Sequence, residues 1–281
     1  MGKLYIVATP IGNLDDITLR ALNILREVDL VAAEDTRHSR KLLSAHNIST
    51  KMIALHEHNE EHKASELLTQ IEGGLSVALI SDAGTPLISD PGYRIVEQAR
   101  VRNIQVVPVP GACAAITALS AGGLPTDRFL FVGFMPAKQQ ARVSALGELQ
   151  SQSATLVFYE APRRIIDLLT DLDAVFGSQR KICIAKELTK TFENFISGTA
   201  SEVRQVLLEN EVLQKGEFVV LVEGFVEEQG LLIEPKILDA VRLACESMPP
   251  KKACGLVAAI SGYKKNQLYQ AYLDAAGTES S

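Results

Sequence analysis

The stretch LYIVATPIGNLDDITLRALNILREVDLVAA, residues 4–33, decides the fold class of this 281-residue chain. It begins with a short apolar run at Leu4–Ala8 and ends with another at Leu30–Ala33. Between them, the apolar residues of Ile17–Val28 recur with the 3.6-residue period of an amphipathic helix, which Asp16 is placed to cap. A strand, a helix and a second strand within about thirty residues predict a βαβ unit and hence a parallel sheet.

The same alternation continues through the first part of the chain. Further strands are expected at Val77–Ser81 and Gln105–Val109, and further helices at Ala64–Glu72, Tyr93–Arg102 and Ala114–Ala121. Residues 1–122 are therefore predicted to form an α/β domain with a mainly parallel sheet covered by helices.

Gly122-Gly123-Leu124-Pro125 is the predicted boundary to a second α/β domain, residues 123–228. Strands are expected there at Phe129–Phe134, Thr155–Tyr159, Lys181–Leu188, Phe192–Ser197 and Phe218–Glu223, and helices at Ala141–Gln150, Arg164–Phe176 and Ser201–Glu209. The third and fourth strands are too close for a crossover helix, so they predict an antiparallel hairpin and a mixed sheet.

The last part, residues 229–281, is predicted to be a small helical tail. A helix starting at Pro235 is followed by helices at Lys251–Ile260 and Lys264–Leu273, with a tight turn around Gly262 between the last two. This is the outline of a helix-turn-helix. Six basic and two acidic residues lie between positions 236 and 265, so the tail is basic on a chain whose net charge is −6.

The composition excludes several classes of protein. The negative net charge excludes a protein that coats nucleic acid by bulk charge, although a local basic patch stays possible. Four widely separated cysteines predict neither disulfides nor a zinc knuckle, which favours a reducing cytoplasm. The longest uncharged stretch, residues 103–126, is interrupted by proline and glycine, so no membrane span is expected.

Two loops that follow predicted strands favour ligand binding. SDAGTPLISDPG at Ser81–Gly92 repeats S-D-x-G at an eight-residue offset, and its glycines and prolines suit a rigid turn that a ligand can approach. PGACAAITAL at Pro110–Leu119 has small side chains with room for a flat group such as adenine. The carboxyl ends of parallel strands are where such sheets bind ligands. The alternatives are a self-capped turn and close helix packing.

The histidine-rich segment HEHNEEH at residues 56–62 raises the question of a metal site. The zincin pattern H-E-x-x-H does not occur in it, and only His58 and His62 share a helical face. We interpret the segment as a polar lining of a cleft, and we predict no metal.

Three further segments have charged residues at the ends of predicted strands: AAEDTRHSRKLL at 32–43, FYEAPRR at 158–164 and AKELTKTFE at 185–193. Their positions suggest a cleft between the two α/β domains.

Nine short motifs together resemble the bacterial small-subunit ribosomal RNA methyltransferase I family. They are TPIGNL, AAEDTRHS, ALHEHNE, SDAGTPLISDPGY, VPVPG, GLPTDRF, FYEAPRR, KELTKTFE and KGE. That family belongs to the tetrapyrrole-methylase-like enzymes that use S-adenosylmethionine, and it methylates the ribose 2′-oxygen of a cytidine. The resemblance covers nearly the whole chain in family order. It implies two α/β domains of the tetrapyrrole-methylase type, with the cofactor between them, and a homodimer.

The resemblance also implies the site residues. SDAG at 81–84 stands where related methylases carry G-D-P, and Cys113 and Ala114 stand where they place small residues against adenosine. The cofactor-binding residues implied in this way are Pro10, Ser81, Asp82, Ala83, Gly84, Cys113, Ala114, Tyr159, Leu188 and Val219.

For catalysis we expect a base that takes the hydroxyl proton. The hypothesis places Asp35, Arg37 and His56 on the substrate side of the cleft. His56 is expected to act as the base, while Asp35 and Arg37 orient the ribose and the phosphate. Glu187 is the competing candidate for the base. In the tail, Lys251, Lys252, Lys264 and Lys265 are expected to meet RNA phosphates. The RNA partner is free small-subunit RNA or the assembled subunit.

Two other functions are compatible with parts of this pattern. A tetrapyrrole methylase would share the fold and the cofactor without needing the basic tail. A non-enzymatic nucleic-acid-binding regulator would use the helix-turn-helix and leave the cleft motifs unexplained.

Overall fold

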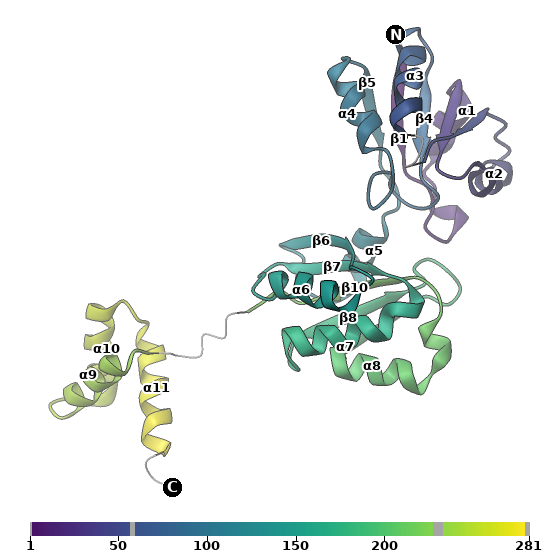
Figure 1. The fold of residues 1–281 in the computed structure, drawn as a ribbon. Helices are drawn as coiled ribbons and strands as arrows, with labels where there is room; N and C mark the ends of the chain where they lie inside the picture. The colour runs from purple at the N-terminus through teal and green to yellow at the C-terminus, as the bar shows by residue number, and fades with distance from the viewer. Residues whose placement is uncertain (1, 57–59, 227–232, 279–281) are drawn as a thin grey trace. The chain divides into compact units, whose positions relative to one another are not determined.

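The computed structural model describes residues 2–56, 60–226 and 233–278. The chain forms two compact units, residues 1–225 and 226–281 (Figure 1). The larger unit contains two separate five-stranded sheets. The predicted domain boundary at residues 122–123 falls between these sheets and stays a prediction.

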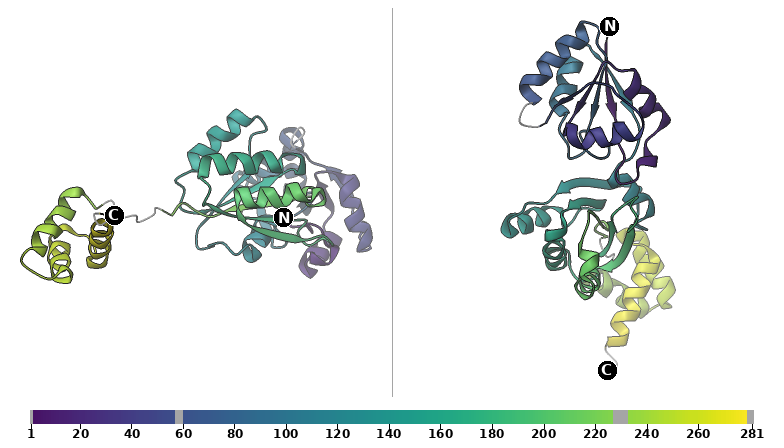
Figure 2. Two further views of the ribbon diagram at one scale, coloured as in Figure 1. Left: turned by 90° about the horizontal axis from the view of Figure 1, so that it is seen from below. Right: turned by 90° about the vertical axis from the view of Figure 1, so that its right-hand side faces the viewer.

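All five strands of the first sheet are parallel, as predicted, and they lie in the order β3-β2-β4-β1-β5. They are β1 (Lys3–Val7), β2 (Leu30–Ala33), β3 (Met52–Ala54), β4 (Val77–Ile80) and β5 (Gln105–Val109). The helices α1 (Leu19–Glu27) and α2 (Thr36–Ala45) pack on one face, and α3 (Glu60–Glu72) and α4 (Tyr93–Val101) pack on the other (Figure 2). Because both faces are covered, β2 and β4 are buried along their whole length.

The second sheet is mixed, as predicted, with the order β6-β7-β10-β8-β9. Its strands are β6 (Phe129–Phe134), β7 (Thr155–Glu160), β8 (Lys181–Lys186), β9 (Asn194–Thr199) and β10 (Phe218–Val222). β6 and β7 are parallel, and the other neighbours are antiparallel, which confirms the predicted β8–β9 hairpin. The helices α6 (Gln139–Leu149), α7 (Ile165–Phe176) and α8 (Ala200–Glu209) cover one face. The other face packs against α5 (Ala114–Ala121) and against Ile11 from the loop after β1.

Several predicted boundaries were wrong, each for a local reason. Asp16 does not cap α1, because it lies in a 3-10 turn, Leu14–Asp16, and Thr18 instead accepts a hydrogen bond from the Ala21 N–H at 3.1 Å. The strand expected at 181–188 ends at Lys186, because Glu187 adopts a left-handed backbone with φ 52°. Two elements were not predicted at all. β3 is a three-residue strand that pairs only with β2, and α2 presents a narrow apolar face.

The smaller unit consists of α9 (Pro235–Cys245), α10 (Pro250–Ser261) and α11 (Lys265–Thr278) among its described residues. Val241, Cys254, Val257 and Leu268 form its buried core. The turn between α10 and α11 requires the left-handed conformation that Gly262 adopts, with φ 78°. The predicted helix-turn-helix-like tail is confirmed.

A buried ion pair joins two helices on the outer layer of the second sheet. The Arg142 Nε of α6 donates to Asp171 Oδ2 of α7 at 2.6 Å, and both side chains are almost fully buried. Gln139 donates to the other oxygen of Asp171 at 3.2 Å. Removing one partner would leave the other as an uncompensated buried charge.

We therefore predict that Asp171→Ala lowers the free energy of unfolding by about 3–5 kcal/mol, measured by urea denaturation. The control is Glu72→Ala, which removes the partly exposed Arg102–Glu72 pair at 3.7 Å. That pair is expected to contribute about 1 kcal/mol or less. Equal effects of the two variants would contradict the argument.

Candidate functional site

A cavity opens at the carboxyl ends of the first sheet. The loops after β1, β4 and β5 meet there, which is where open parallel sheets bind ligands. A backbone bridge joins the first two of these loops, because the Thr9 N–H donates to the Gly84 oxygen at 2.8 Å and the Gly84 N–H donates to the Thr9 oxygen at 3.1 Å. The Thr85 hydroxyl then donates to the Ala112 oxygen at 2.9 Å and so ties in the third loop.

The second sheet supplies the opposite wall. Side chains of β7, β8 and β10 that point away from α6–α8 face the cavity, among them Tyr159, Ala185 and Val219. The Tyr159 hydroxyl accepts a hydrogen bond from the Ala115 N–H at 3.1 Å, and its ring makes edge-to-face contacts with Phe131 and Phe134. Burial, and then the neighbouring Cys113, raise the pKa of this phenol, so it stays protonated at neutral pH.

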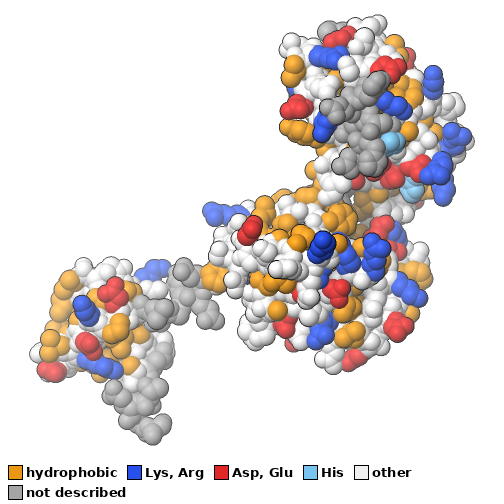
Figure 3. Space-filling model, viewed as in Figure 1, with side chains coloured by type: hydrophobic (Ala, Val, Ile, Leu, Met, Phe, Trp, Pro, Cys, Tyr) orange, Lys and Arg blue, Asp and Glu red, His pale blue; other side chains and the backbone are white. Residues whose placement is uncertain are grey.

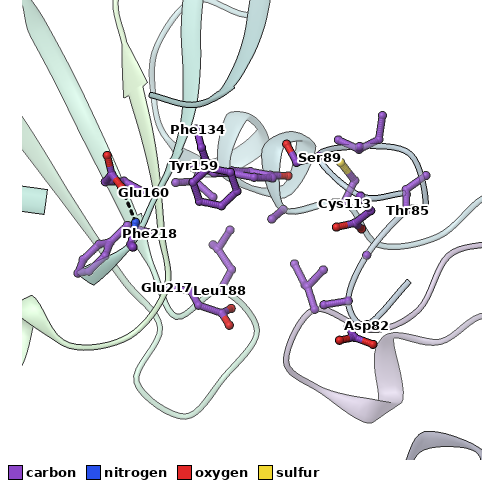
Figure 4. Close-up of a pocket in the computed structure, with 18 of the residues that line it drawn as sticks. Asp82, Thr85, Ser89, Cys113, Phe134, Tyr159, Glu160, Leu188, Glu217 and Phe218 are labelled. Carbon is purple, nitrogen blue, oxygen red and sulfur yellow. Dashed lines mark hydrogen bonds between the residues drawn. The ribbon is translucent and has the colours of Figure 1, made fainter. Parts of the chain in front are cut away.

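The cavity has a volume of about 440 Å³, which is the size of a typical small-molecule site. Figure 4 shows Asp82, Thr85, Ser89 and Cys113 on one side and Tyr159, Leu188, Glu217 and Phe218 on the other. Its lining is largely apolar but includes five carboxylates, those of Glu34, Asp82, Asp90, Glu160 and Glu217. None of the described residues that line it is a lysine, arginine or histidine.

Three of these carboxylates come from the loops of the first sheet and influence one another. The pKa of Asp90 is raised to about 6, mainly by burial and in addition by the charges of Glu34 and Asp82, while a hydrogen bond with Ser81 acts in the opposite direction. Burial and the Asp82 charge likewise raise the pKa of Glu34. Such an environment favours a ligand that carries positive charge.

Eight of the ten residues predicted for the cofactor line this cavity: Asp82, Ala83, Gly84, Cys113, Ala114, Tyr159, Leu188 and Val219. Ser81 is buried beneath the loop, where its hydroxyl lies 3.3 Å from the Ala83 oxygen and steadies the turn. Pro10 is not among the lining residues, whereas its neighbour Ile11 is.

The residues predicted for the substrate side lie next to the cavity, outside its lining. The Asp35 N–H donates to Asp82 Oδ1 at 3.0 Å, which links the start of α2 to the ligand loop. The Asp35 side chain pairs with Arg37, whose hydrogen bonds lower the pKa of the carboxyl to about 2. The Arg37 side chain is 90% exposed. His56 follows β3 and is near enough to Glu34 to influence it electrostatically.

Glu187 sits beside the cavity in a network of its own. Its Oε1 accepts from Lys190 Nζ at 3.0 Å and from the Glu217 N–H at 2.9 Å. Burial opposes ionisation of this carboxyl, but these hydrogen bonds outweigh it and lower its pKa. A carboxylate held in this way is a weak proton acceptor.

The four predicted RNA-binding lysines are exposed in the smaller unit. Lys251 and Lys252 lie in the first turn of α10, while Lys264 and Lys265 stand at the start of α11. The Lys251 ammonium lies 5.8 Å from the centre of the Tyr269 ring.

The histidine pair His58 and His62 lies outside the residues whose side chains the structure describes. Within the described part of the chain, no three His, Cys, Asp or Glu side chains are arranged to hold a metal ion. In the same part, no helix combines the length and the apolar character needed to cross a membrane.

Several lining residues were not predicted individually as site residues: Glu34, Thr85, Ser89, Asp90, Phe134, Glu160, Glu217 and Phe218. Five of them, Glu34, Thr85, Ser89, Asp90 and Glu160, lie in segments that the sequence already linked to a ligand loop or to the cleft. For Asp90 a signal was present, because it belongs to the second copy of the S-D-x-G repeat. Glu217 belongs to the KGE motif that contributed to the resemblance. For Phe134 and Phe218 no local signal exists, since only the pairing of the second sheet brings them to the cavity.

Two family profiles match the chain. The family described as “Tetrapyrrole (Corrin/Porphyrin) Methylases” matches residues 3–204, and the one described as “RsmI C-terminal HTH domain” matches residues 232–276. A “Ribosomal RNA small subunit methyltransferase I” of Pasteurella multocida is 52% identical over 269 residues, covering 96% of this chain and 96% of that protein. A protein of the same name from Pseudomonas aeruginosa is 50% identical over 277 residues, covering 98% of each.

Solved structures share the fold at lower identity. The crystal structure of diphthine synthase has a TM-score of 0.62 at 15% identity and covers 79% of this chain and 90% of that chain. Uroporphyrin-III C-methyltransferase of Thermus thermophilus, crystallised with S-adenosyl homocysteine, has a TM-score of 0.55 at 19% identity and covers 78% and 97%.

Proposed function

This chain belongs to the ribosomal RNA small subunit methyltransferase I family, and from that premise we propose that it methylates the 2′-oxygen of a cytidine in small-subunit ribosomal RNA. The methyl donor is S-adenosylmethionine. The observation that carries the proposal is the identity of 50–52% to two members along nearly the whole of both chains. The match of residues 232–276 to the family's own helical tail supports the RNA substrate over a tetrapyrrole.

The cavity fits this cofactor chemically. S-adenosylmethionine supplies a methyl group that its sulfonium cation has already activated. Of the five carboxylates in the lining, Glu160 is paired with Arg164 and Glu217 with Lys190. The other three, Glu34, Asp82 and Asp90, suit a cationic ligand. Small and apolar side chains at Cys113, Ala114, Leu188 and Val219 suit a flat adenine. We propose that these residues, with Asp82, Ala83, Gly84 and Tyr159, hold the cofactor.

The protein's own task is then to orient the ribose and to exclude water. Asp35 and Arg37 are proposed to orient ribose and phosphate, because the exposed Arg37 is anchored to Asp35, which is itself linked to Asp82. Lys and Arg side chains lie over both α/β parts of the larger unit on the face in Figure 3, mixed with Asp and Glu, so individual basic side chains are available to phosphates there. From the resemblance we further propose a cytoplasmic homodimer that acts on free RNA or on the assembled subunit.

The tail lysines support an RNA anchor on electrostatic grounds. All four stand at the N-terminal ends of α10 and α11, where the helix dipole disfavours positive charge. The partial positive charge of a helix N-terminus also favours phosphate, although the Lys252 N–H already donates to the Pro249 oxygen at 2.8 Å and the Lys264 N–H donates to Gln267 Oε1 at 3.1 Å. Lysines kept at an unfavourable place beside an anion-binding helix end are best explained by a phosphate partner.

We predict that the purified protein transfers a labelled methyl group from S-adenosylmethionine to small ribosomal subunits or their RNA. A 2′-O-methyl group removes the nucleophile of alkaline RNA cleavage, so one phosphodiester should become resistant to alkali after the reaction. Methyl transfer to a porphyrinoid, with none to RNA, would contradict the proposed substrate.

Gly84→Ala is predicted to weaken binding of S-adenosylmethionine about tenfold or more by isothermal titration. Gly84 has φ 83°, and an added Cβ would lie 3.3 Å from Ile11 Cγ2 in the cavity wall. The control, Gly74→Ala, meets the same backbone strain at φ 113° but has no atom within 4 Å of its new Cβ. Both are expected to lose about 1–2 kcal/mol of stability. If both bind the cofactor equally well, this loop does not hold it.

Lys264→Ala combined with Lys265→Ala is predicted to lower the salt dependence of RNA binding. Each lost phosphate contact reduces the slope of log K against log salt by about 1. The control is Lys181→Ala with Lys215→Ala, which removes the same charge from exposed positions of the larger unit. An unchanged slope in the tail variant would remove the anchor role.

A further inference from the structure

We propose that Asp90 is a catalytic residue whose carboxylate accepts the proton of the substrate hydroxyl during methyl transfer. The inference rests on the proposed function and names the proton acceptor that this function requires. The sequence placed Asp90 in a candidate ligand loop but gave it no catalytic role. Asp90 replaces His56 and Glu187 as the proton acceptor.

Asp90 lies in the wall of the same cavity as Asp82, Cys113 and Tyr159. Its neighbour Ser89 lies beside the hydroxyl end of Tyr159 and near Cys113 (Figure 4). The residue therefore stands among the groups proposed to hold the cofactor, where a proton acceptor must be if it is to touch the reacting hydroxyl.

The surroundings of Asp90 make its carboxylate more basic than usual. It is half-buried, and the groups that face it are the Ser81 hydroxyl, the phenol of Tyr159 and the carboxyls of Glu34 and Asp82. No lysine, arginine or histidine is among the described residues lining the cavity. Burial and the like charges raise its pKa to about 6, so at neutral pH it is mostly ionised yet accepts a proton readily.

The backbone holds Asp90 firmly in place. Leu87 and Ser89 both adopt left-handed conformations, with φ of 75° and 65°, which non-glycine residues rarely do. Gly92, with φ 127°, then caps α4 two residues after Asp90. Loops of this kind persist where the surrounding structure fixes them, and a fixed position is what a proton acceptor needs.

The two carboxylates that the sequence suggested for the substrate side, Asp35 and Glu187, are engaged elsewhere. The Asp35 carboxylate is paired with Arg37, and the hydrogen bonds lower its pKa to about 2. Glu187 is held by Lys190 and by the Glu217 N–H. Both are therefore weaker proton acceptors than Asp90.

In the resulting step, the 2′-oxygen forms a bond to the methyl carbon while the carbon–sulfur bond breaks. The electron pair of that bond stays on the sulfur, and the hydroxyl proton passes to the Asp90 carboxylate. Asp90 then returns the proton to water after the product leaves, so no oxidant, reductant or further reactant is needed.

Asp90→Asn is the first test, because it keeps the shape and removes the charge. Methyl transfer to ribosomal RNA should fall about 10²–10⁴-fold, while S-adenosylmethionine binding changes only a few-fold. In wild type, kcat/KM, which reports groups of the free protein, should rise with pH through about 6, since protonated Asp90 cannot accept the proton. This rise in kcat/KM with pH should be absent in Asp90→Asn and should return in part in Asp90→Glu.

A second readout does not depend on activity. The folded state holds the Asp90 proton more tightly than the unfolded state, so its ionisation destabilises the fold above about pH 6, and the destabilisation disappears as pH falls towards 4. Asp90→Asn should therefore be more stable than wild type to urea at pH 8 and equally stable near pH 4. A loss of activity in a more stable variant cannot be due to unfolding.

The matched control is Asp167→Asn, the same change at an exposed position of α7, which should alter neither readout. Glu187→Gln and His56→Ala are measured alongside. If Asp90→Asn stays active and its kcat/KM still rises with pH through about 6, the inference is overturned while the proposed function stands. If that rise is lost in His56→Ala instead, His56 has the role of proton acceptor. A wild-type protein that leaves ribosomal RNA unmethylated overturns the proposed function, and the inference with it.

Discussion

The cavity depends on one apolar contact, the packing of α5 and Ile11 against the inner face of the second sheet. Ala115, Ala118 and Leu119 of α5 pack there against Val157, Cys183 and Leu221. Gly122 at the end of α5 permits this approach, since a Cβ there would lie only 2.3 Å from Leu221 Cδ1. The cluster brings loops of a parallel sheet to the face of a mixed sheet. Without it, neither sheet alone would enclose a site.

The acidic character of the site follows from this packing, which limits the access of water and brings no basic side chain into the described lining. Carboxylates of several loops end in a space that water only partly reaches and that contains no basic side chain among the described lining residues. Ionisation of Glu34 and Asp90 there costs folding free energy, because burial and neighbouring like charges raise the pKa of both carboxyls. Groups with a perturbed pKa are common at functional sites, where the loss of stability is offset by function. Here the carboxylates suit a cationic methyl donor and provide a proton acceptor with a pKa near neutral.

The helical tail uses charge in the opposite way. Its core is small and apolar, formed by residues such as Val241 and Leu268, and the four lysines proposed to bind RNA are exposed at the surface, with Lys251 lying over the Tyr269 ring. They stand at helix ends that already favour anions. An acidic cavity for a small cation and a basic surface for a polyanion are thus separated along one chain, between residues 1–225 and 226–281.

Much of this protein was determined by sequence alone. Apolar periodicity located most of the strands and helices, and glycine and proline located the main turns, because these signals act within a few residues. Motif resemblance identified the family and eight residues of the cavity lining. β3 and α2 escaped, since a three-residue edge strand and a helix with a narrow apolar face carry little local signal.

Only the tertiary structure decided which charges act together. Asp35 and Arg37 neutralise each other, and Glu187 is bound to Lys190, although the sequence presents all of them as equally available. The sequence places Asp90 in a candidate ligand loop, but only folding places it beside Glu34, Asp82 and Tyr159. The reason is physical. The basicity of a carboxylate is set by burial and by the charges around it, and these come from segments far apart in the chain.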